Sequence, residues 1–207
     1  MALIIPMYSD FICPFCYVGF ATMRKLKREF DFTIEYHGFQ IHPEWPAEGM
    51  PAEKFRMGMD PEQRRAIWER IVAMGAGAGI EMKAPTTLAN SRLALEANLF
   101  ATEHGVAEAF QDGVFRAYFA EGLNIGERDV IRRIATDVGL DAVAITDALD
   151  SKRYAPRIEA ARMRANQLGV SGVPTFYFGE YPLVGAQSED VMRRVLARAT
   201  QMQGAAK

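Results

Sequence analysis

Two cysteines stand three positions apart in Cys13-Pro14-Phe15-Cys16, and the sequence contains no others. The apolar residues before this motif predict a strand and those after it a helix, which places Cys13 at a helix N-terminus. The unpaired N–H groups and partial positive charge there favour the thiolate, the nucleophilic form of cysteine. Pro14 suits the first helical turn, which needs no amide hydrogen at that position. Cys16 lies about one turn further on, where it can attack a disulfide formed on Cys13, so the motif predicts dithiol redox chemistry.

The composition limits where this chemistry takes place and with which partners. The chain has 207 residues, 49% of them hydrophobic, and a net charge of −2. No block of Lys and Arg indicates a nucleic-acid or membrane surface, so neither partner is expected. Met1 to Tyr8 is too short for a signal sequence, and no apolar run reaches the roughly 18 residues of a membrane span. We therefore expect a cytoplasmic protein, in which the two cysteines cycle and do not form a structural disulfide.

The first elements form a βαβ unit. Leu3 to Ser9 is rich in strand-forming residues, Cys16 to Phe30 has a helical pattern, and Phe32 to His37 alternates as a strand does. A connection without regular structure follows, marked by Pro43, Pro46, Gly49 and Pro51.

The middle of the chain, from about Pro51 to Leu168, is helical in pattern almost throughout. It predicts an all-helical insertion of several short helices. The breaks between them are expected at Gly75 to Gly79, Pro85, Gly105, Gly122 to Gly126 and Gly139.

Strand character returns only near the end. Val173 to Phe178 and Tyr181 to Val184, joined at Gly179-Glu180, predict a hairpin, and Ser188 is expected to cap a last helix. The fold class is therefore α/β, with βαβ followed by helices and then ββα. We predict a discontinuous domain of residues 1–46 and 169–207 and a helical insertion of residues 47–168.

In its motifs the chain resembles the DsbA family of thioredoxin-fold oxidoreductases over nearly its whole length. The resemblance rests on the Cys-Pro-Phe-Cys motif, the helical block and Gly172 to Phe176 before the hairpin. The chain looks most like the FrnE-type branch, which carries an Asp-x-x-Cys-Pro-x-Cys-Tyr-x-Gly pattern. The matching residues are Asp10, Cys13, Pro14, Cys16, Tyr17 and Gly19, with weaker likeness at Asn90 to Leu93 and Gly185 to Gln187.

The resemblance implies a role for the segment Val173-Pro174-Thr175. In the thioredoxin fold the Val173–Pro174 bond is expected to be cis and to face the cysteines. The Val173 backbone then pairs with an extended substrate segment and holds the target cysteine near Cys13. Without the resemblance, Pro174 would simply begin an edge strand.

The chain departs from the family at two points. Many thioredoxin-fold enzymes have a buried acid six positions before the first cysteine, where this chain has Met7. Asp10 is the nearest carboxylate in sequence, and a turn or cap role for it competes with proton transfer. A second cysteine pair, which some FrnE-type proteins carry, is absent.

Other residues near the motif allow a functional and a structural interpretation. Phe11, Ile12, Phe15 and Tyr17 are expected to form a partly apolar rim, with Phe15 exposed and about half of the others buried. Trp45 and Trp68 are expected to be packed in the core more readily than to line a groove.

Three further features of the sequence are not interpreted as functional sites. Zinc binding by Cys13, Cys16, His37 and His42 is not expected because the gap between the two pairs is too long, and no metal site is predicted. His104 is expected at a helix C-terminus, and the Gly75 to Gly79 segment lacks the context of a phosphate loop.

The sequence thus predicts a reductase or isomerase of protein disulfides without a resident cofactor, with Cys13 as nucleophile and Cys16 as the resolving thiol. Pro14, Phe15 and Asp10 support the motif, and Val173, Pro174 and Thr175 bind substrate. The competing hypothesis is a glutathione-dependent isomerase or transferase, because hydroxychromene-carboxylate isomerases and kappa-type glutathione transferases share the predicted plan. Those enzymes typically have serine where Cys13 stands. Glutathione as co-substrate and a homodimer are left open.

Overall fold

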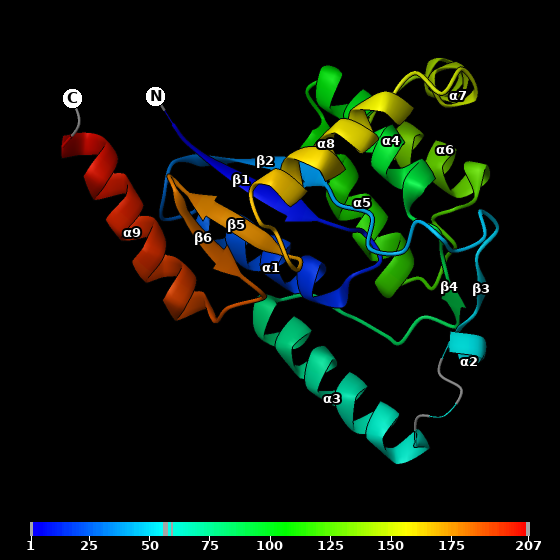
Figure 1. Ribbon diagram of the computed structural model, residues 1–207, viewed down its shortest axis with the longest axis horizontal. Helices are drawn as coiled ribbons and strands as arrows, with labels where there is room; N and C mark the ends of the chain where they lie inside the picture. The colour runs from blue at the N-terminus through cyan, green and yellow to red at the C-terminus, as the bar shows by residue number, and fades with distance from the viewer. Residues whose placement is uncertain (1, 56–57, 59, 206–207) are drawn as a thin grey trace.

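A computed structural model describes residues 2–55, 58 and 60–205 of the chain. Its elements follow the predicted order (Figure 1). The strands are β1 (Leu3–Ser9), β2 (Phe32–Gly38), β3 (Met50–Pro51), β4 (Thr87–Leu88), β5 (Thr175–Phe178) and β6 (Tyr181–Val184). The helices are α1 (Pro14–Leu26), α2 (Ala52–Phe55), α3 (Pro61–Ala78), α4 (Arg92–Glu103), α5 (Ala107–Phe119), α6 (Arg128–Asp137), α7 (Ala142–Asp150), α8 (Ala155–Gln167) and α9 (Glu189–Ala205).

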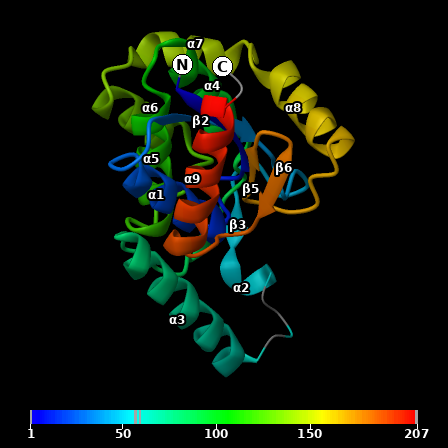
Figure 2. The ribbon, with the colours of Figure 1, turned by 90° about the vertical axis from the view of Figure 1, so that its left-hand side faces the viewer.

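A four-stranded sheet in the order β2-β1-β5-β6 forms the centre of the fold. β1 runs parallel to β2 from the Leu3–Phe32 pair to the Ser9–Gly38 pair, and β5 runs antiparallel to both β1 and β6. Helices α1 and α9 pack against each other on one side of this sheet, and α8 covers the other side next to β2 (Figure 2). The predicted α/β thioredoxin fold with a large insertion is confirmed, and the insertion is mainly helical.

Helix α1 is the buried centre of the molecule. Nine of its thirteen residues are buried, from Cys16 to Leu26. The Tyr17 ring stacks on Phe115 at 5.0 Å and on Phe119 at 5.9 Å, and Phe20 packs against Phe115 at 5.6 Å. These contacts attach the dithiol helix to α5, so the core is continuous between the sheet and the helical block.

Three details of the insertion and its neighbours differ from the predictions. The insertion is not all-helical, because Met50–Pro51 and Thr87–Leu88 pair as a two-stranded ribbon, too short to show periodicity. Helix α3 continues through Gly75 and Gly77 and ends only at Gly79, where the left-handed φ of 81° suits glycine. Helix α1 ends at Leu26, earlier than predicted. The proposed boundaries at residues 46, 47, 168 and 169 stay predictions.

Candidate active site

The backbone places Cys13 at the start of α1. Cys13 is the extended residue before the helix (φ −88°, ψ 116°), as the following Pro14 favours, and its carbonyl accepts from the N–H groups of Cys16 at 3.1 Å and Tyr17 at 3.3 Å. Both cysteines are free thiols; Cys13 is 6% exposed and Cys16 is fully buried. The predicted position of the dithiol at a helix N-terminus is therefore observed.

The two thiols have opposite acidity. The pKa of Cys13 is lowered, chiefly by a hydrogen bond from the Cys16 thiol and against the effect of burial, with help from the backbone N–H groups of Cys16 and Phe15. Burial raises the pKa of Cys16 well above its usual value, and the negative charge of Cys13 adds to that rise. Cys13 is thus the better nucleophile and leaving group, and Cys16 is the thiol that holds its proton.

The loop before β5 lies against Cys13, 160 residues away in sequence. The Cys13 thiol donates to the carbonyl oxygen of Val173, with 3.7 Å between Sγ and O. The Val173–Pro174 peptide bond is cis. The hydroxyl of Thr175 donates to the Gly172 carbonyl at 2.7 Å and its side chain is buried, so Thr175 holds this turn together. The substrate-binding role of these residues stays a prediction.

Asp10 is a fully buried carboxylate next to the motif. One oxygen, Oδ2, accepts from the Ile41 N–H at 2.8 Å, and Oδ1 accepts weakly from the Ile12 N–H at 3.4 Å. Asp10 therefore ties the loop before α1 to the segment after β2, as a turn residue does. Burial is the largest effect on its pKa, which is raised to about 6 although these N–H groups, Ser91 and His42 favour the charged form.

Three hydroxyls around the dithiol were not identified from the sequence. Ser9, Tyr36 and Ser91 come from β1, β2 and the residue before α4, and each is buried. Ser9 lies by Cys16 and Tyr36, and Ser91 lies by Asp10. The only signal in the sequence was the Asn90 to Leu93 segment, which was noted for its resemblance and not for its chemistry.

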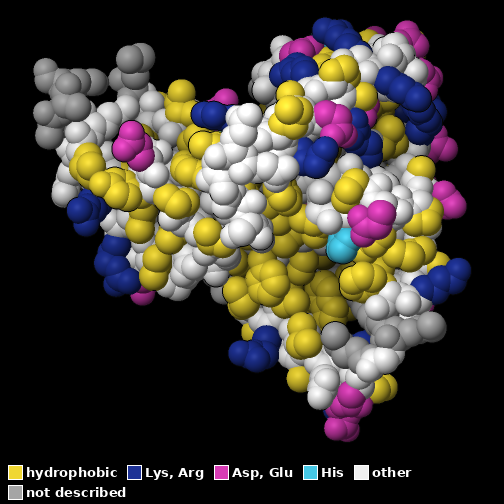
Figure 3. Space-filling model, viewed as in Figure 1, with side chains coloured by type: hydrophobic (Ala, Val, Ile, Leu, Met, Phe, Trp, Pro, Cys, Tyr) yellow, Lys and Arg dark blue, Asp and Glu magenta, His cyan; other side chains and the backbone are white. Residues whose placement is uncertain are grey.

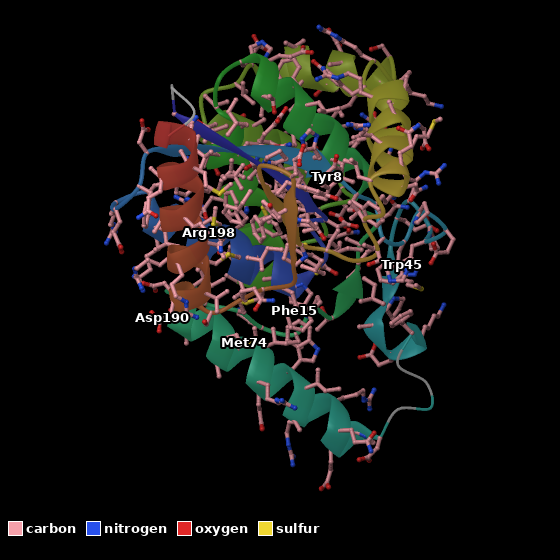
Figure 4. All side chains as sticks on the ribbon, turned by 60° about the vertical axis from the view of Figure 1, so that its left-hand side comes forward. Tyr8, Phe15, Trp45, Met74, Asp190 and Arg198 are labelled. Carbon is pink, nitrogen blue, oxygen red and sulfur yellow. The ribbon has the colours of Figure 1, made fainter. Side chains whose placement is uncertain are left out.

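The predicted apolar rim is smaller than expected. Phe15 is 40% exposed, as predicted, and lies at the end of α1 that faces α3 (Figure 4). Phe11, Ile12 and Tyr17 are all buried, however, whereas about half of them were expected at the surface. Phe11 stacks on Tyr36 and meets Phe115 edge-on, both at 5.0 Å, so it joins the sheet to α5.

An apolar groove of about 600 Å³ lies beside the motif, between α3 and the β3–β4 ribbon. In the space-filling view it belongs to the hollowed apolar surface above α3 (Figure 3). Ile12, the residue before Cys13, forms part of its wall. Trp45 and Trp68 pack against the core, as expected, and also line this groove. The other lining residues are Phe55, Gly58, Gln63, Arg64, Ile67, Pro85, Leu88 and Tyr118.

The histidines make their contacts with aromatic side chains, a carboxylate and the helix backbone. His42 stacks on Trp45 at 4.0 Å and its Nδ1 contacts Glu44, while His37 stacks on Tyr8 at 4.9 Å. His104 is the C-cap of α4, as predicted. Within residues 2–55, 58 and 60–205, no group of three or more His, Cys, Asp or Glu side chains is arranged to hold a metal ion. None of the helices in that part of the chain is both long enough and apolar enough to span a bilayer.

The sheet order, the dithiol at the start of α1 and the facing cis-proline loop define a thioredoxin-fold protein. The model of the DSBA-like thioredoxin domain matches residues 4–197, and the chain belongs to that family. Two curated relatives cover nearly all of it. The uncharacterized protein YwbO of Bacillus subtilis (strain 168) is 28% identical, over 95% of this chain and 97% of its own length. The 2-hydroxychromene-2-carboxylate isomerase of Sphingobium xenophagum is 27% identical, over 93% and 97%.

Solved structures show the same fold. A structure described as a probable DsbA oxidoreductase from Streptomyces coelicolor is similar with a TM-score of 0.87 at 27% identity, covering 96% of this chain and 90% of that one. The cytosolic disulfide reductase DsbM from Pseudomonas aeruginosa, solved with GSH, has a TM-score of 0.70 at 20% identity, covering 97% and 100%. The family thus includes proteins named as oxidoreductases and as isomerases.

Proposed function

We propose that the protein is a thiol-disulfide oxidoreductase that acts on protein disulfides through Cys13 and Cys16. The observation that carries the proposal is the asymmetry of the two thiols. Cys13 lies at the helix N-terminus with a lowered pKa, and the fully buried Cys16 donates a hydrogen bond to it. A nucleophile with a resolving thiol beside it is the arrangement that thiol-disulfide exchange needs.

The exchange has two steps. The Cys13 thiolate attacks one sulfur of the substrate disulfide, forms a mixed disulfide and releases the other sulfur as a thiolate. Cys16 then loses its proton and attacks Cys13, which forms the Cys13–Cys16 disulfide and releases the second substrate thiolate. The substrate gains two electrons and the dithiol loses two. In isomerisation the first step is the same, but a different thiolate of the substrate then attacks the mixed disulfide. A new substrate disulfide forms, Cys13 leaves as a thiolate, and no electrons are gained or lost overall.

The surroundings of Cys13 favour a polypeptide substrate. The carbonyl of Val173 lies next to Cys13, and Val173 is only half-buried. The turn at Val173 is therefore accessible to an extended segment of a substrate. Phe15 and the groove beside Ile12 supply apolar surface for the side chains next to the target cysteine.

The test is thiol trapping with a reporter protein that contains disulfides. Cys16→Ser is expected to accumulate a mixed disulfide with the reporter on non-reducing electrophoresis, whereas wild type passes through it and Cys13→Ser forms none. A Cys16→Ser variant that forms no adduct with any protein disulfide would overturn the proposal.

A second candidate is a glutathione-dependent isomerase of small molecules. The 27% identity to a 2-hydroxychromene-2-carboxylate isomerase and the groove beside Ile12, which carries Arg64 among apolar side chains, favour it. Unlike the serine typical of those enzymes, Cys13 here has a resolving thiol beside it, which diverts bound glutathione into disulfide exchange. Isomerase turnover that persists in Cys13→Ser would support this candidate against the first.

Three further statements belong to the same proposal. We place the protein in the cytoplasm, which the cytosolic DsbM of similar fold supports. Glutathione is a candidate thiol partner, since that reductase was solved with GSH, and no resident cofactor is required. The FrnE-type branch and the homodimer stay predictions.

A further inference from the structure

One wall of the groove beside the dithiol is an irregular segment. Trp45 lies in the connection between β2 and β3 (Figure 4), and residues 46–48 directly after it are exposed. The Trp45 ring stacks on His42 at 4.0 Å and meets Phe55 edge-on at 5.4 Å. His42 is only half-buried and Phe55 is 56% exposed. These rings lie at the surface themselves, so the backbone of the connection has to be held by other groups.

The Asn90 side chain holds this backbone at Trp45. Asn90 lies two residues before α4 begins and is only 8% exposed. Its Nδ2 donates to the Trp45 carbonyl at 2.6 Å. Its Oδ1 accepts from the Arg92 N–H at 2.9 Å and from Gln40 Nε2 at 2.8 Å. One buried amide thus joins the irregular connection, the start of α4 and the segment that follows β2.

The partners of Asn90 restrict which residue can stand there. A backbone N–H only donates and a backbone carbonyl only accepts, so the side chain must accept at one atom and donate at another. Asparagine does both. Aspartate would keep the bonds from Arg92 and Gln40, but it would present an acceptor to the Trp45 carbonyl. Of the three bonds, the one to Trp45 is therefore the one that needs the amide nitrogen.

A second asparagine holds the same connection a few residues further on. Asn124 lies between α5 and α6, and its Nδ2 donates to the Glu48 carbonyl at 2.8 Å while its Oδ1 accepts from the Gly126 N–H at 3.0 Å. A Cβ at Gly126 would come within 2.9 Å of the Ala47 carbonyl oxygen, so the connection passes close to this turn. Both asparagines bond to backbone carbonyls, and together they fix the path of the connection.

The position of Trp45 matters because of what the groove contains. Trp45 lines the groove together with Ile12, the residue before Cys13. The other aromatic lining residues are Phe55, Trp68 and Tyr118. Aromatic walls provide a large apolar area for one side chain of a substrate held at Cys13. A displaced wall reduces that area and weakens binding of the substrate, but it changes no group that touches the reacting sulfur atoms.

We propose that Asn90 is a positioning residue for substrate selection, because its bond to the Trp45 carbonyl keeps the aromatic wall of the groove in place. The substrates selected are protein disulfides with an aromatic or aliphatic residue next to the target cysteine. Asn124 supports the same wall from Glu48. The inference rests on the proposed function and names its substrate class. Neither asparagine takes part in the exchange, so loss of either bond weakens binding of such substrates and leaves the reactivity of Cys13 unchanged.

The test removes one hydrogen bond with an isosteric variant. Asn90→Asp keeps the acceptor for Arg92 and Gln40, and a carboxylate near a helix N-terminus is favourable. Reduced protein is mixed with an excess of a peptide disulfide that has phenylalanine beside each cysteine, and its oxidation is followed by acid quenching and thiol alkylation. The variant is expected to raise the half-saturation concentration of the peptide about fivefold, with the limiting rate within about twofold.

Two comparisons show whether the effect acts through the groove. A peptide with serine in place of phenylalanine should give the same half-saturation concentration for Asn90→Asp and wild type. Attack of Cys13 on the small disulfide dithiobis(nitrobenzoate) should also proceed at the same rate in both. In a Trp45→Ala background, Asn90→Asp should have no further effect on the phenylalanine peptide, since the group through which it acts is gone.

Asn98 provides a matched control for stability. It is a buried asparagine of α4 whose Oδ1 accepts from Gln111 Nε2 at 3.0 Å, so Asn98→Asp also places a carboxylate in the interior. This variant should leave the half-saturation concentration of the phenylalanine peptide unchanged. If Asn90→Asp does not fold, Asn124→Asp replaces it, because Asn124 is only half-buried and the variant keeps the bond from Gly126.

The results that contradict the inference differ from those that contradict the proposed function. Equal half-saturation concentrations for wild type and Asn90→Asp with the phenylalanine peptide would overturn the inference. So would an equal rise with the serine peptide, an equal rise in Asn98→Asp, or a slower attack on dithiobis(nitrobenzoate). If wild type is oxidised by neither peptide nor by the small disulfide, it is the proposed function that fails.

Discussion

Two identical side chains acquire opposite properties from their positions in the site. Cys13 is at the helix start, where N–H groups and the Cys16 thiol surround its sulfur, and Cys16 lies inside the core, where an anion has no solvation. The donor that contributes most to the acidity of Cys13 is Cys16, so the resolving thiol also prepares the nucleophile.

This dependence can be measured with two substitutions at one position. Cys16→Ala removes the hydrogen-bond donor and is expected to raise the pKa of Cys13, whereas Cys16→Ser keeps a donor and should raise it less. The absorbance of the thiolate against pH reports both. Ionisation of Cys13 at the same pH in Cys16→Ala and in wild type would show that the helix N-terminus acts alone.

Asp10 carries a cost in stability that should appear as a pH dependence. Burial raises its pKa in the folded state to about 6 from 3.8, so folding favours the protonated form. That contribution is complete below about pH 4 and is lost as the pH rises through 6, which amounts to about 3 kcal/mol. The free energy of unfolding of reduced Asp10→Asn, relative to wild type, should therefore increase by about this amount from pH 4 to pH 7. If the free energies of unfolding of the two proteins, measured by urea titration, change in parallel with pH, the raised pKa of Asp10 is contradicted.

The sequence allowed prediction of the reactive residues, which lie in one short segment. It did not allow prediction of the residues that surround them from segments far away in the chain. Cys13, Cys16 and Pro14 could be placed because a strand, a motif and a helix are adjacent in the chain. Asp10 could be noticed but not assigned a role, because the N–H group that its Oδ2 accepts from belongs to Ile41, 31 residues away. Ser9, Tyr36 and Ser91 become a cluster only through strand pairing and the packing of α4, which single-sequence periodicity does not contain.

Among the elements, the presence of the helices was predicted better than the residues at which they begin and end. The boundaries at Gly105 and Gly139 follow from left-handed glycines, with φ of 74° and 82°. Gly75 and Gly77 look the same in the sequence but lie inside α3. A Cβ at Gly75 would come within 2.8 Å of the Met82 sulfur, so the close packing of Met82, and not a turn, favours glycine there.

Two other helical glycines provide a test of this distinction. At Gly77 of α3 a Cβ would meet nothing within 4 Å, so Gly77→Ala is expected to stabilise the protein by about 0.5–1 kcal/mol. At Gly113 of α5 it would come within 2.8 Å of a methyl group of the buried Ile134, so Gly113→Ala should destabilise by about 1–3 kcal/mol. Urea unfolding measures both. Equal shifts in the same direction would mean that propensity, and not the α5–α6 packing, decides.

The packing between the sheet and the helical block determines what lies next to the dithiol. The aromatic contacts of Tyr17 and Phe20 with α5 fix α1 within one continuous core, and the same packing brings α3 beside α1. The groove between α3 and the β3–β4 ribbon therefore begins at Ile12, the neighbour of Cys13. A polypeptide held at Cys13 can reach this groove, whereas a small disulfide need not.

Two exposed residues of α3 can show whether the groove selects substrates. Ile67 is 45% exposed and lines the groove, and Val72 is 38% exposed on the same helix but does not line it. Ile67→Ser removes apolar contact worth about 1 kcal/mol and should lower kcat/KM about fivefold for a peptide disulfide with apolar flanking residues. Val72→Ser should not lower it. Neither variant should alter the rate at which Cys13 attacks the small disulfide dithiobis(nitrobenzoate), measured from the coloured thiolate that this attack releases. If Ile67→Ser slows the peptide and the small disulfide equally, the groove affects Cys13 itself and does not select the substrate.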